Sequence, residues 1–471
     1  MAGDNLHVVM IPWSAFGHMI PFLQLSIALA KSGVQVSLLS TPRNIQRLPK
    51  PPPNLSSLIN LVELPFPSLD DKYLLPDGAE ATLDIPIEKM DALKIAYDLL
   101  KQPFKQYVVD HKPDWIFVDF NTDWAIDVAQ ELGIPSVWFS IFGTATDVFL
   151  GPPEYLSGEG QQRVRPSPES LMSPPEWVTF PSSVACRSFE VIVNYALLYK
   201  ENSTGKKDGA RLAKIIDASQ AVVIRTCTEF EGEYLNLYER LIGKPAIPAG
   251  LLLPEPKKRE VGDGSWGEVF KWLDGQKPKS VVFVGFGSEY KLTKDHVYEI
   301  AHGLELSELP FLWALRKPDW ATDNLSALPS GFSHRTAKKG MVCMGWVPQL
   351  EVLAHPSIGG SLVHSGWGSV IETLQFGHVL VVLPFAIDQG MNASLLVDKG
   401  LAVEVERKED GSFGRNDIAK SLRLAMVLEE GEQLRIRTRE AVAIFGDRKL
   451  QENYIDSLVQ FLKNGVTKVK Q

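Results

Sequence analysis

The sequence predicts an α/β protein with two halves of similar design, each built around a parallel β-sheet. Short apolar runs of strand length, rich in Val, Ile and Phe, alternate with amphipathic helical stretches, as they do in βαβ units. The alternation breaks off at a charged stretch near the middle of the chain and then restarts. A chain of 471 residues is also too long for one ordinary core, which indicates more than one domain.

In the first half, strands are expected over residues 6–11, 34–39, 115–118 and 136–139. Two helices are expected between them, over residues 21–32 and 124–132. The pattern then fails over residues 151–183, a stretch that contains seven prolines. A loop of this length inside a compact domain usually has a function or moves, so it is a candidate functional segment.

Residues 253–265 are charged and contain Pro and Gly, which predicts an interdomain linker. After the linker, strands are expected over residues 280–285, 311–315, 341–344, 360–363 and 379–383. Helices are expected over residues 294–305 and 454–462. The predicted domains are therefore 1–252 and 266–450, with residues 451–471 forming a C-terminal helix that packs back toward the first domain.

Composition and charge exclude several classes of protein. The hydrophobic fraction of 45% and the charged fraction of 22% are typical of globular proteins. The net charge of −9 argues against a nucleic-acid partner. Three cysteines without a metal-binding spacing suggest a reducing compartment. Neither a secretory signal nor an apolar run of the ~20 residues that span a bilayer is found, so we expect a cytoplasmic protein without a transmembrane segment. We also expect a monomer, although one sequence does not determine the oligomeric state.

Polar or aromatic residues follow six of the predicted strands at the point where each strand ends. In open parallel sheets, ligands bind beyond the carboxyl ends of the strands. The residues that follow these strands are His18, Asp119, Gly287 with Ser288, Trp346, His364, and Asp388 with Gln389. Together they predict one ligand-binding cleft between the two halves.

Two of these places allow both a structural and a chemical interpretation. Residues 364–372, HSGWGSVIE, lead from a strand through a Gly-containing turn into a helix, whose N-terminus can bind phosphate. Ser369 and Glu372 also fit an ordinary capping box. His18 and Asp119 could each simply belong to a turn. If they pair, the carboxylate holds one imidazole nitrogen and leaves the other free to accept a proton.

The block from residue 346 to 389, WVPQLEVLAHPSIGGSLVHSGWGSVIETLQFGHVLVVLPFAIDQ, resembles the C-terminal signature of plant family-1 UDP-sugar glycosyltransferases. PWSAFGH resembles the family's loop with the catalytic His, VDF the position of its activating Asp, and VGFGS its phosphate-proximal loop. The resemblance extends over essentially the whole chain. It implies a GT-B fold, in which two Rossmann-like domains with parallel sheets face each other across a cleft.

The resemblance also implies the chemistry and the partners. The first domain would bind a small glycosylated apolar acceptor, and the second would bind the UDP-sugar, which is a co-substrate rather than a cofactor. His18 would act as the base and Asp119 would stabilise its imidazolium, in an inverting transfer that needs no metal. The absence of an Asp-x-Asp motif agrees with a metal-independent reaction.

The donor would be bound by residues of the second half: Ser288, Trp346, Val347, Gln349, His364, Trp367, Gly368, Ser369, Glu372, Asp388 and Gln389. By the family's roles, Trp346 stacks on uracil, with the backbone of the next residue at its edge, and Glu372 binds the ribose. His364, Ser369 and Ser288 would hold the diphosphate, and Trp367, Asp388 and Gln389 would face the transferred sugar.

Two positions depart from the family pattern: Ser365 stands where Cys is common and Gly368 where Asn is common. The missing Asn removes one side-chain donor near the phosphates, although the N–H of a Gly can still approach closely. The departures therefore bear on donor affinity and sugar choice rather than on the chemistry.

Within the family, SAFGH, PRNIQRLPK, EWVTFPSSVA, LPFLWALRKP and HSGWGSVIE resemble the branch that extends existing sugar chains, in particular legume saponin rhamnosyltransferases. This implies UDP-rhamnose as the donor and a sugar hydroxyl of a triterpenoid saponin as the acceptor. The pair Asp388-Gln389 is common among the family's glucosyltransferases, so UDP-glucose, with saponin or flavonoid glycosides as acceptors, is the leading alternative.

Five aromatic residues near strand ends of the first half either line an apolar acceptor pocket or pack in the core: Trp13, Phe120, Trp124, Phe139 and Phe142. A Rossmann oxidoreductase is disfavoured because no strand is followed by Gly-x-Gly-x-x-Gly. A non-catalytic carrier of saponins or nucleotides is disfavoured because both His18 and Asp119 are present.

Overall fold

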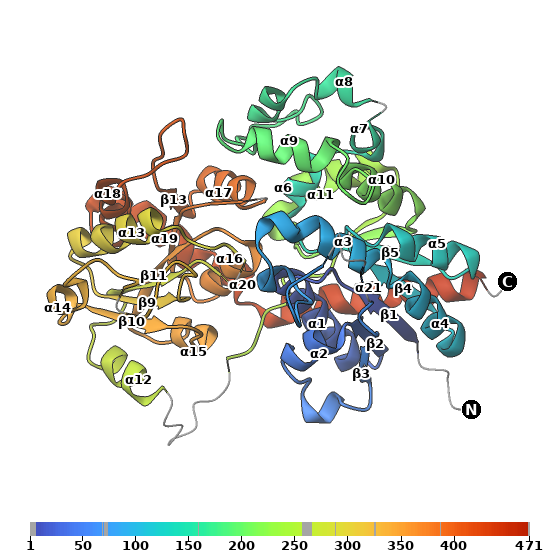
Figure 1. Cartoon of the computed structure of the whole chain (residues 1–471), viewed down its shortest axis with the longest axis horizontal. Coiled ribbons are helices and arrows are strands. Elements are labelled where there is room, and N and C mark those ends of the chain that lie inside the picture. The colour runs from blue at the N-terminus through green and yellow to red at the C-terminus, as the bar shows by residue number, and fades with distance from the viewer. Residues whose placement is uncertain are drawn as a thin grey trace. The chain divides into compact units, whose positions relative to one another are not determined.

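The computed structural model describes residues 6–469 except 68, 70–73, 159, 257–265, 288, 325 and 387. The chain divides into two compact units (Figure 1). The first unit consists of Met1–Phe180, Val191–Leu252 and Arg448–Gln471, and the second of Pro181–Glu190 and Leu253–Asp447. Most of the predicted linker, residues 257–265, lies outside the described residues.

The first unit contains a seven-stranded parallel sheet in the order β3-β2-β1-β4-β5-β6-β7. Its strands are β1 (His7–Ile11), β2 (Gln35–Ser40), β3 (Ile59–Glu63), β4 (Trp115–Val118), β5 (Ser136–Ser140), β6 (Ala221–Ile224) and β7 (Ala246–Pro248). β4, β5 and β6 are buried along their whole length, which explains why they read as continuous apolar runs. β3, β6 and β7 were not among the expected strands.

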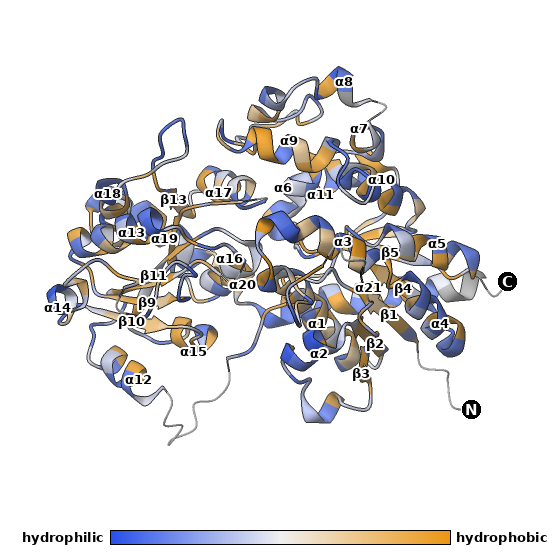
Figure 2. Ribbon diagram, in the orientation of Figure 1, coloured by the Kyte–Doolittle hydropathy of each residue, from blue (hydrophilic) through white to orange (hydrophobic). Residues whose placement is uncertain are grey.

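The helices of the first unit are α1 (Phe16–Lys31), α2 (Pro42–Arg47), α3 (Met90–Asp98), α4 (Lys101–His111), α5 (Asp123–Glu131), α6 (Thr144–Leu150), α7 (Pro153–Ser157), α8 (Gln161–Val164), α9 (Val191–Tyr199), α10 (Asp208–Ala218), α11 (Thr228–Ile242) and α21 (Arg448–Val469). Short 3₁₀ helices span η1 (Pro53–Leu55), η3 (Thr82–Asp84), η4 (Ile87–Lys89) and η5 (Pro168–Met172). α9 is largely apolar along its ribbon (Figure 2).

The proline-rich stretch 151–183 is not a plain loop, as the sequence had suggested, because it contains α7, α8 and η5. Pro153 and Pro168 stand at the first position of α7 and η5. Proline is tolerated there, since the first N–H of a helix has no partner within the helix and the fixed φ suits a helix start. These prolines therefore begin short helices.

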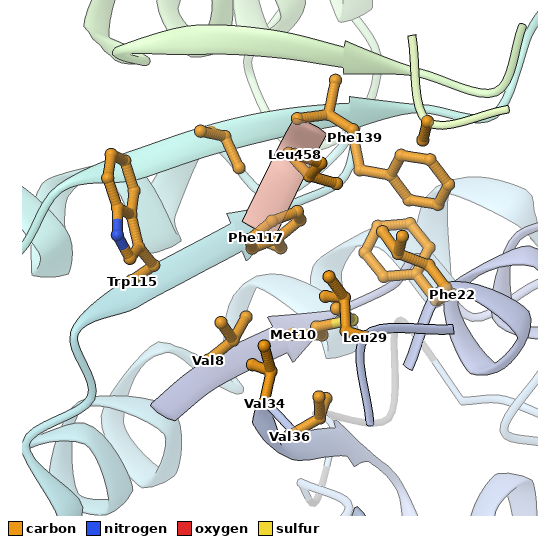
Figure 3. Close-up of a cluster of buried hydrophobic side chains, with 14 of the residues drawn as sticks. Val8, Met10, Phe22, Leu29, Val34, Val36, Trp115, Phe117, Phe139 and Leu458 are labelled. Carbon is orange, nitrogen blue, oxygen red and sulfur yellow. The ribbon is translucent and has the colours of Figure 1, made fainter. Parts of the chain in front are cut away.

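Side chains from both ends of the chain build the core of the first unit. Val8 and Met10 from β1 pack with Phe117 from β4 and with Leu458 from α21, and all four are fully buried (Figure 3). The indole Nε1–H of Trp115 donates to the carbonyl of Leu462 in α21 at 3.0 Å. The last helix of the chain is thus part of the first core.

The second unit contains a six-stranded parallel sheet in the order β10-β9-β8-β11-β12-β13. Its strands are β8 (Val281–Gly285), β9 (Phe311–Leu315), β10 (Gly340–Met344), β11 (Ile358–Val363), β12 (Val379–Val382) and β13 (Ala402–Glu404). Its helices are α12 (Gly267–Asp274), α13 (Lys294–Ser307), α14 (Phe332–Thr336), α15 (Gln349–Leu353), α16 (Trp367–Leu374), α17 (Gln389–Asp398), α18 (Arg415–Met426), α19 (Glu432–Glu440) and α20 (Val442–Phe445), with the 3₁₀ helix η6 (Glu429–Gly431). Each unit is a Rossmann-like α/β layer structure, as the sequence predicted.

Ten residues that the predicted boundaries placed within 1–252 belong to the second unit, Pro181–Glu190. The Arg187 guanidinium forms an ion pair with the carboxylate of Glu404, and the Ser183 hydroxyl donates to Asp398 at 2.6 Å. These contacts attach the segment to β13 and α17. None of the helices within the described residues is both long and apolar enough to cross a lipid bilayer.

Candidate active site

His18 and Asp119 lie next to each other at the carboxyl edge of the first sheet. β1 and β4 are neighbouring parallel strands in which Ile11 pairs with Val118, so the residues that follow both strands emerge side by side. Asp119 comes directly after β4, and His18 lies in the first turn of α1. Nδ1 of His18 is 2.8 Å from Oδ2 of Asp119.

The Asp119 carboxylate is buried and held by the backbone as well as by the histidine. Oδ2 also accepts from the N–H of Trp13 at 2.8 Å, and Oδ1 accepts from the N–H of Phe120 at 2.7 Å. Since a carboxylate only accepts hydrogen bonds, Nδ1 of His18 is the nitrogen that donates to it, and in the neutral imidazole Nε2 then carries the free lone pair. The imidazole is 13% exposed and so lies at the edge of the core.

Two of the five aromatic residues predicted for the acceptor pocket lie beside His18, and a third packs behind one of them. The ring centroids of Phe120 and Phe142 lie 5.2 and 6.0 Å from that of His18, and both side chains are half-buried. Trp13 is buried and packs edge-on against Phe120, with 6.3 Å between the ring centroids. The rings beside the imidazole form an apolar surface of the kind that an apolar ligand contacts.

Trp124 and Phe139 are core residues, so of the two alternatives that the sequence left open they pack in the core and do not line an acceptor pocket. Phe139 is fully buried and packs edge-on against Phe22 at 4.9 Å (Figure 3). Trp124 is buried on α5, with its ring against Phe104 at 5.4 Å. β5 directs Phe139 into the sheet's packing layer.

Tyr97 and Thr122 support the site and were not singled out from the sequence. The Tyr97 hydroxyl donates to the carbonyl of Pro12 at 2.7 Å, and its ring packs edge-on against Trp13. Burial raises the pKa of Tyr97 well above its ordinary value, which keeps the hydroxyl protonated as a donor. The Thr122 hydroxyl accepts from the N–H of Asp119 at 3.0 Å. Tyr97 is 85 residues from its partner, so no local motif marks it.

In the second unit, His364 follows β11, and its ring lies against the backbone of two glycines, Gly287 and Gly366. A Cβ at Gly366 would be 2.7 Å from Nε2 of His364, and one at Gly287 would be 3.0 Å from it. Gly287 also has a φ of +70°, which a side chain rarely adopts. Burial lowers the pKa of His364 to about 4, so the ring is neutral at pH 7. Its Nδ1 is buried and makes no hydrogen bond within the described part of the chain.

The helix after His364 begins earlier than the capping-box interpretation requires. α16 starts at Trp367 with Gly366 as its N-cap, so Ser369 is the third helical residue and not a cap. The interpretation of Ser369 and Glu372 as a capping box is therefore wrong. Gly368 and Ser369 lie half-buried in the first turn, where backbone N–H groups point out of the helix.

Glu372 joins α16 to α15, since its Oε2 accepts from Nε2 of Gln349 at 2.7 Å. Trp346 and Val347 come shortly before α15. Val347 is buried, whereas Trp346 is 73% exposed. Trp266, which was not singled out from the sequence, packs edge-on against Trp346 at 5.9 Å. The structure thus provides an exposed indole plane and, on α16, a carboxylate held by an amide. Ser288 lies outside the described residues.

Asp388 and Gln389 stand at the start of α17, on the loop after β12. Oε1 of Gln389 accepts from the N–H groups of Phe385 and Ala386 at 2.9 and 3.1 Å. Oδ2 of Asp388 accepts from Nδ2 of Asn392 at 2.8 Å. These contacts give both side chains a defined orientation at the carboxyl edge of the second sheet.

Ser365 connects this loop to the turn that carries His364. It has a φ of +60°, and its buried hydroxyl is 2.7 Å from the carbonyl of Gln389 and 2.5 Å from that of His364. Nδ2 of Asn392 donates to the carbonyl of Ser365 at 3.0 Å. Among the residues that the structure describes, no group of three or more His, Cys, Asp or Glu side chains is arranged to hold a metal ion.

The chain is similar to known proteins in both sequence and fold. Residues 267–429 match the family model "UDP-glucoronosyl and UDP-glucosyl transferase". The chain is 44% identical to UDP-glycosyltransferase 91A1 of Arabidopsis thaliana over 98% of its own length and 97% of the relative's. It is 39% identical to the soyasaponin III rhamnosyltransferase of Glycine max, over 97% of this chain and 95% of that one.

A solved structure shares the fold. The crystal structure of Glycyrrhiza uralensis UGT73P12, complexed with glycyrrhetinic acid 3-O-monoglucuronide, aligns with a TM-score of 0.81 and 25% identity, covering 99% of this chain and 98% of that one. This confirms the GT-B fold, and the relatives at 44% and 39% identity over nearly their whole length confirm the family. The chain therefore belongs to the plant family-1 UDP-glycosyltransferases, enzymes that use a UDP-sugar as donor.

Proposed function

We propose that this glycosyltransferase moves a sugar, with inversion and without a metal, onto a hydroxyl of a small glycosylated apolar acceptor. The observation that carries the proposal is the 2.8 Å contact between Nδ1 of His18 and the buried carboxylate of Asp119. This contact leaves Nε2 as the proton acceptor, beside the half-buried rings of Phe120 and Phe142.

The transfer is a single displacement. Nε2 of His18 takes the proton of the acceptor hydroxyl, and the Asp119 carboxylate stabilises the resulting imidazolium. The acceptor oxygen forms a bond to the anomeric carbon as the bond to UDP breaks on the opposite face, which inverts that carbon. A positioned base of this kind contributes roughly 10²–10⁴-fold to the rate.

In this proposal, the first unit binds the acceptor and the second unit binds the donor. The exposed indole of Trp346 stacks on uracil, and the carboxylate of Glu372 accepts from the ribose hydroxyls. Neutral His364 and the first turn of α16 donate to the diphosphate as it gains charge. Asp388 and Gln389 bind hydroxyls of the transferred sugar.

The acceptor we propose is a triterpenoid saponin glycoside, and UDP-rhamnose is the preferred donor. Similarity to a soyasaponin III rhamnosyltransferase supports both assignments. Similarity to a structure complexed with glycyrrhetinic acid 3-O-monoglucuronide supports a glycosylated apolar acceptor. The pair Asp388-Gln389, which suits the hydroxyls of a glucose unit, favours UDP-glucose as the second candidate donor.

A panel of donors and acceptors tests the proposal. UDP-rhamnose, UDP-glucose and UDP-galactose are each combined with saponin and flavonoid glycosides, and UDP release is measured. We expect the fastest release with UDP-rhamnose and a saponin glycoside. His18→Ala should slow release by at least ~10²-fold because the base is lost, while UDP still binds in calorimetry.

The exposed residue His111 on α4 provides a matched control, and His111→Ala should release UDP at the wild-type rate. If His18→Ala also kept that rate, His18 could not be the base. If wild-type protein bound UDP-sugars but released no UDP with any acceptor, the protein would be a carrier and the proposed function would be wrong.

A further inference from the structure

Ten consecutive residues, Pro181–Glu190, pack with the second unit although the chain on both sides of them belongs to the first. We call this segment the strap. Its Ser183 N–H and hydroxyl donate to the Asp398 carboxylate at the end of α17, at 2.8 and 2.6 Å. The Ser188 hydroxyl donates to the carbonyl of Glu409 at 3.3 Å. The strap is therefore attached along most of its length.

Arg187 makes the most extensive contacts of the strap. Its Nε donates to Oε1 of Glu404 at 2.9 Å and its Nη2 to Oε2, which is a two-point ion pair with the end of β13. The backbone N–H of Arg187 donates to the Glu190 carboxylate at 2.7 Å. With the guanidinium only 18% exposed, the orientation of the side chain is set from several sides.

The remaining arm of Arg187 reaches the loop that carries the proposed sugar-binding residues. Nη1 donates to the carbonyl of Gly390, the residue after Gln389. A Cβ at Gly390 would lie 2.6 Å from Oε1 of Glu190 and 2.8 Å from Nη1 of Arg187. The strap thus lies directly on the first turn of α17, so close that a side chain at residue 390 would displace the Glu190 carboxylate and the Arg187 guanidinium.

A second arginine holds the other end of the same loop. Nη2 of Arg407 donates to the carbonyl of Pro384, and its guanidinium lies 5.1 Å from the ring centroid of Phe189 in the strap. The same guanidinium lies 5.0 Å from the ring centroid of Phe385 in the loop. Strap residues therefore contribute at both ends of the loop that runs from Pro384 to Gly390.

We propose that Arg187 is a positioning residue for recognition of the donor sugar, an inference that rests on the proposed roles of Asp388 and Gln389. Arg187 does not touch the sugar. It fixes the backbone at Gly390, so that the two side chains before it keep their direction. Because small displacements of groups that bind substrate reduce productive binding steeply, a loosened strap weakens recognition of the sugar and leaves recognition of UDP intact.

The experiment compares donor and product binding in Arg187→Gln and Arg187→Lys. We measure KM for UDP-rhamnose and UDP-glucose, the inhibition constant of UDP, and the melting temperature. UDP lacks the transferred sugar, so its inhibition constant should change less than about twofold, while KM for the accepted UDP-sugar rises about tenfold. Lys keeps the charge but lacks the planar fork, so Arg187→Lys should fold and show the same change in ratio.

Arg415 on α18 is the matched control, because its Nε and Nη2 donate to the Glu299 carboxylate in the same unit. Arg415→Gln should leave both constants unchanged. The inference is overturned if, in Arg187→Lys, KM for the UDP-sugar and the inhibition constant of UDP rise together or both stay at wild-type values. If the Arg187→Gln protein is insoluble, the constants of Arg187→Lys alone test the inference. Wild-type protein that releases no UDP would instead overturn the proposed function.

Discussion

Burial keeps two imidazoles of the second unit, those of His364 and His378, uncharged at neutral pH. It lowers the pKa of His364 to about 4 and that of His378 to about 3. Nε2 of His378 donates to the carbonyl of Leu353 at 2.6 Å, and its Nδ1 is 3.4 Å from the Lys279 ammonium, which also disfavours a second proton. Both rings are therefore neutral donors over the physiological pH range.

These two imidazoles make the stability of the protein depend on pH. Below about pH 6.5 the unfolded chain binds protons at both positions, whereas the folded chain does so only near pH 4 and 3. The free energy of unfolding therefore falls as the pH decreases from about 6.5 toward 4, by up to about 1.4 kcal/mol per pH unit for each ring.

His378→Gln should reduce this dependence, because an amide still donates to the Leu353 carbonyl but does not titrate. The urea midpoint, measured at about pH 5 and about pH 7, should differ less in the variant than in the wild type. His334, an exposed residue on α14, is the control, and His334→Gln should retain the wild-type difference. A midpoint difference as large in His378→Gln as in the wild type would contradict the prediction.

At the scale of elements, the turn between β11 and α16 depends on a glycine that has no side chain. Gly366 is the N-cap of α16, and the His364 ring occupies the space that a side chain at 366 would need. Gly287, two residues after the end of β8, also lacks a Cβ, which would lie 3.0 Å from the same ring. Two loops can thus close on one imidazole only because neither carries a Cβ there.

Gly366→Ala should weaken UDP binding. The new Cβ would lie 2.7 Å from Nε2 of His364, so the ring must move and the proposed contact with the diphosphate is lost. Loss of a hydrogen bond to a charged group corresponds to roughly tenfold weaker binding. Calorimetry with UDP measures the change. Gly267, where an added Cβ meets nothing within 4 Å, is the matched control. Equal UDP affinity in Gly366→Ala and Gly267→Ala would show that His364 does not contribute to donor binding.

At the scale of the whole molecule, the end of the chain completes the unit in which the chain begins. Ile455, Leu458 and Leu462 of α21 are buried in the core that contains Val8. A backbone contact adds to this packing, since Oε1 of Gln451 accepts from the N–H of Leu251 at 2.7 Å. The core of the first unit is therefore incomplete without α21.

Leu458→Ala should destabilise the first unit by about 2–5 kcal/mol, because Leu458 is fully buried and its loss leaves a cavity. Urea unfolding followed by tryptophan fluorescence measures the change. Leu197 on α9, which is 42% exposed in the same unit, is the control, and Leu197→Ala should cost far less. Similar losses in the two variants would show that α21 adds little to the core.

The fold class could be predicted from the sequence because local patterns encode it. Strands buried on both faces must be apolar along their length, so β4 and β9 are visible as WIFV and FLWAL. β7 and β13 have only three residues each, too few to show a pattern, and they become strands because longer neighbours pair with them.

Part of the candidate site was also predictable by itself. Residues that follow parallel strands share one edge of a sheet, so the positions of His18 and Asp119 in the sequence were enough to bring them together in a hypothesis. Tertiary structure alone decided that Phe139 is core and Phe120 lies beside the imidazole, that Tyr97 supports the loop, and that Arg187 reaches Gly390. Such contacts join residues that are far apart in the chain, and they depend on how completed elements pack, which no local pattern records.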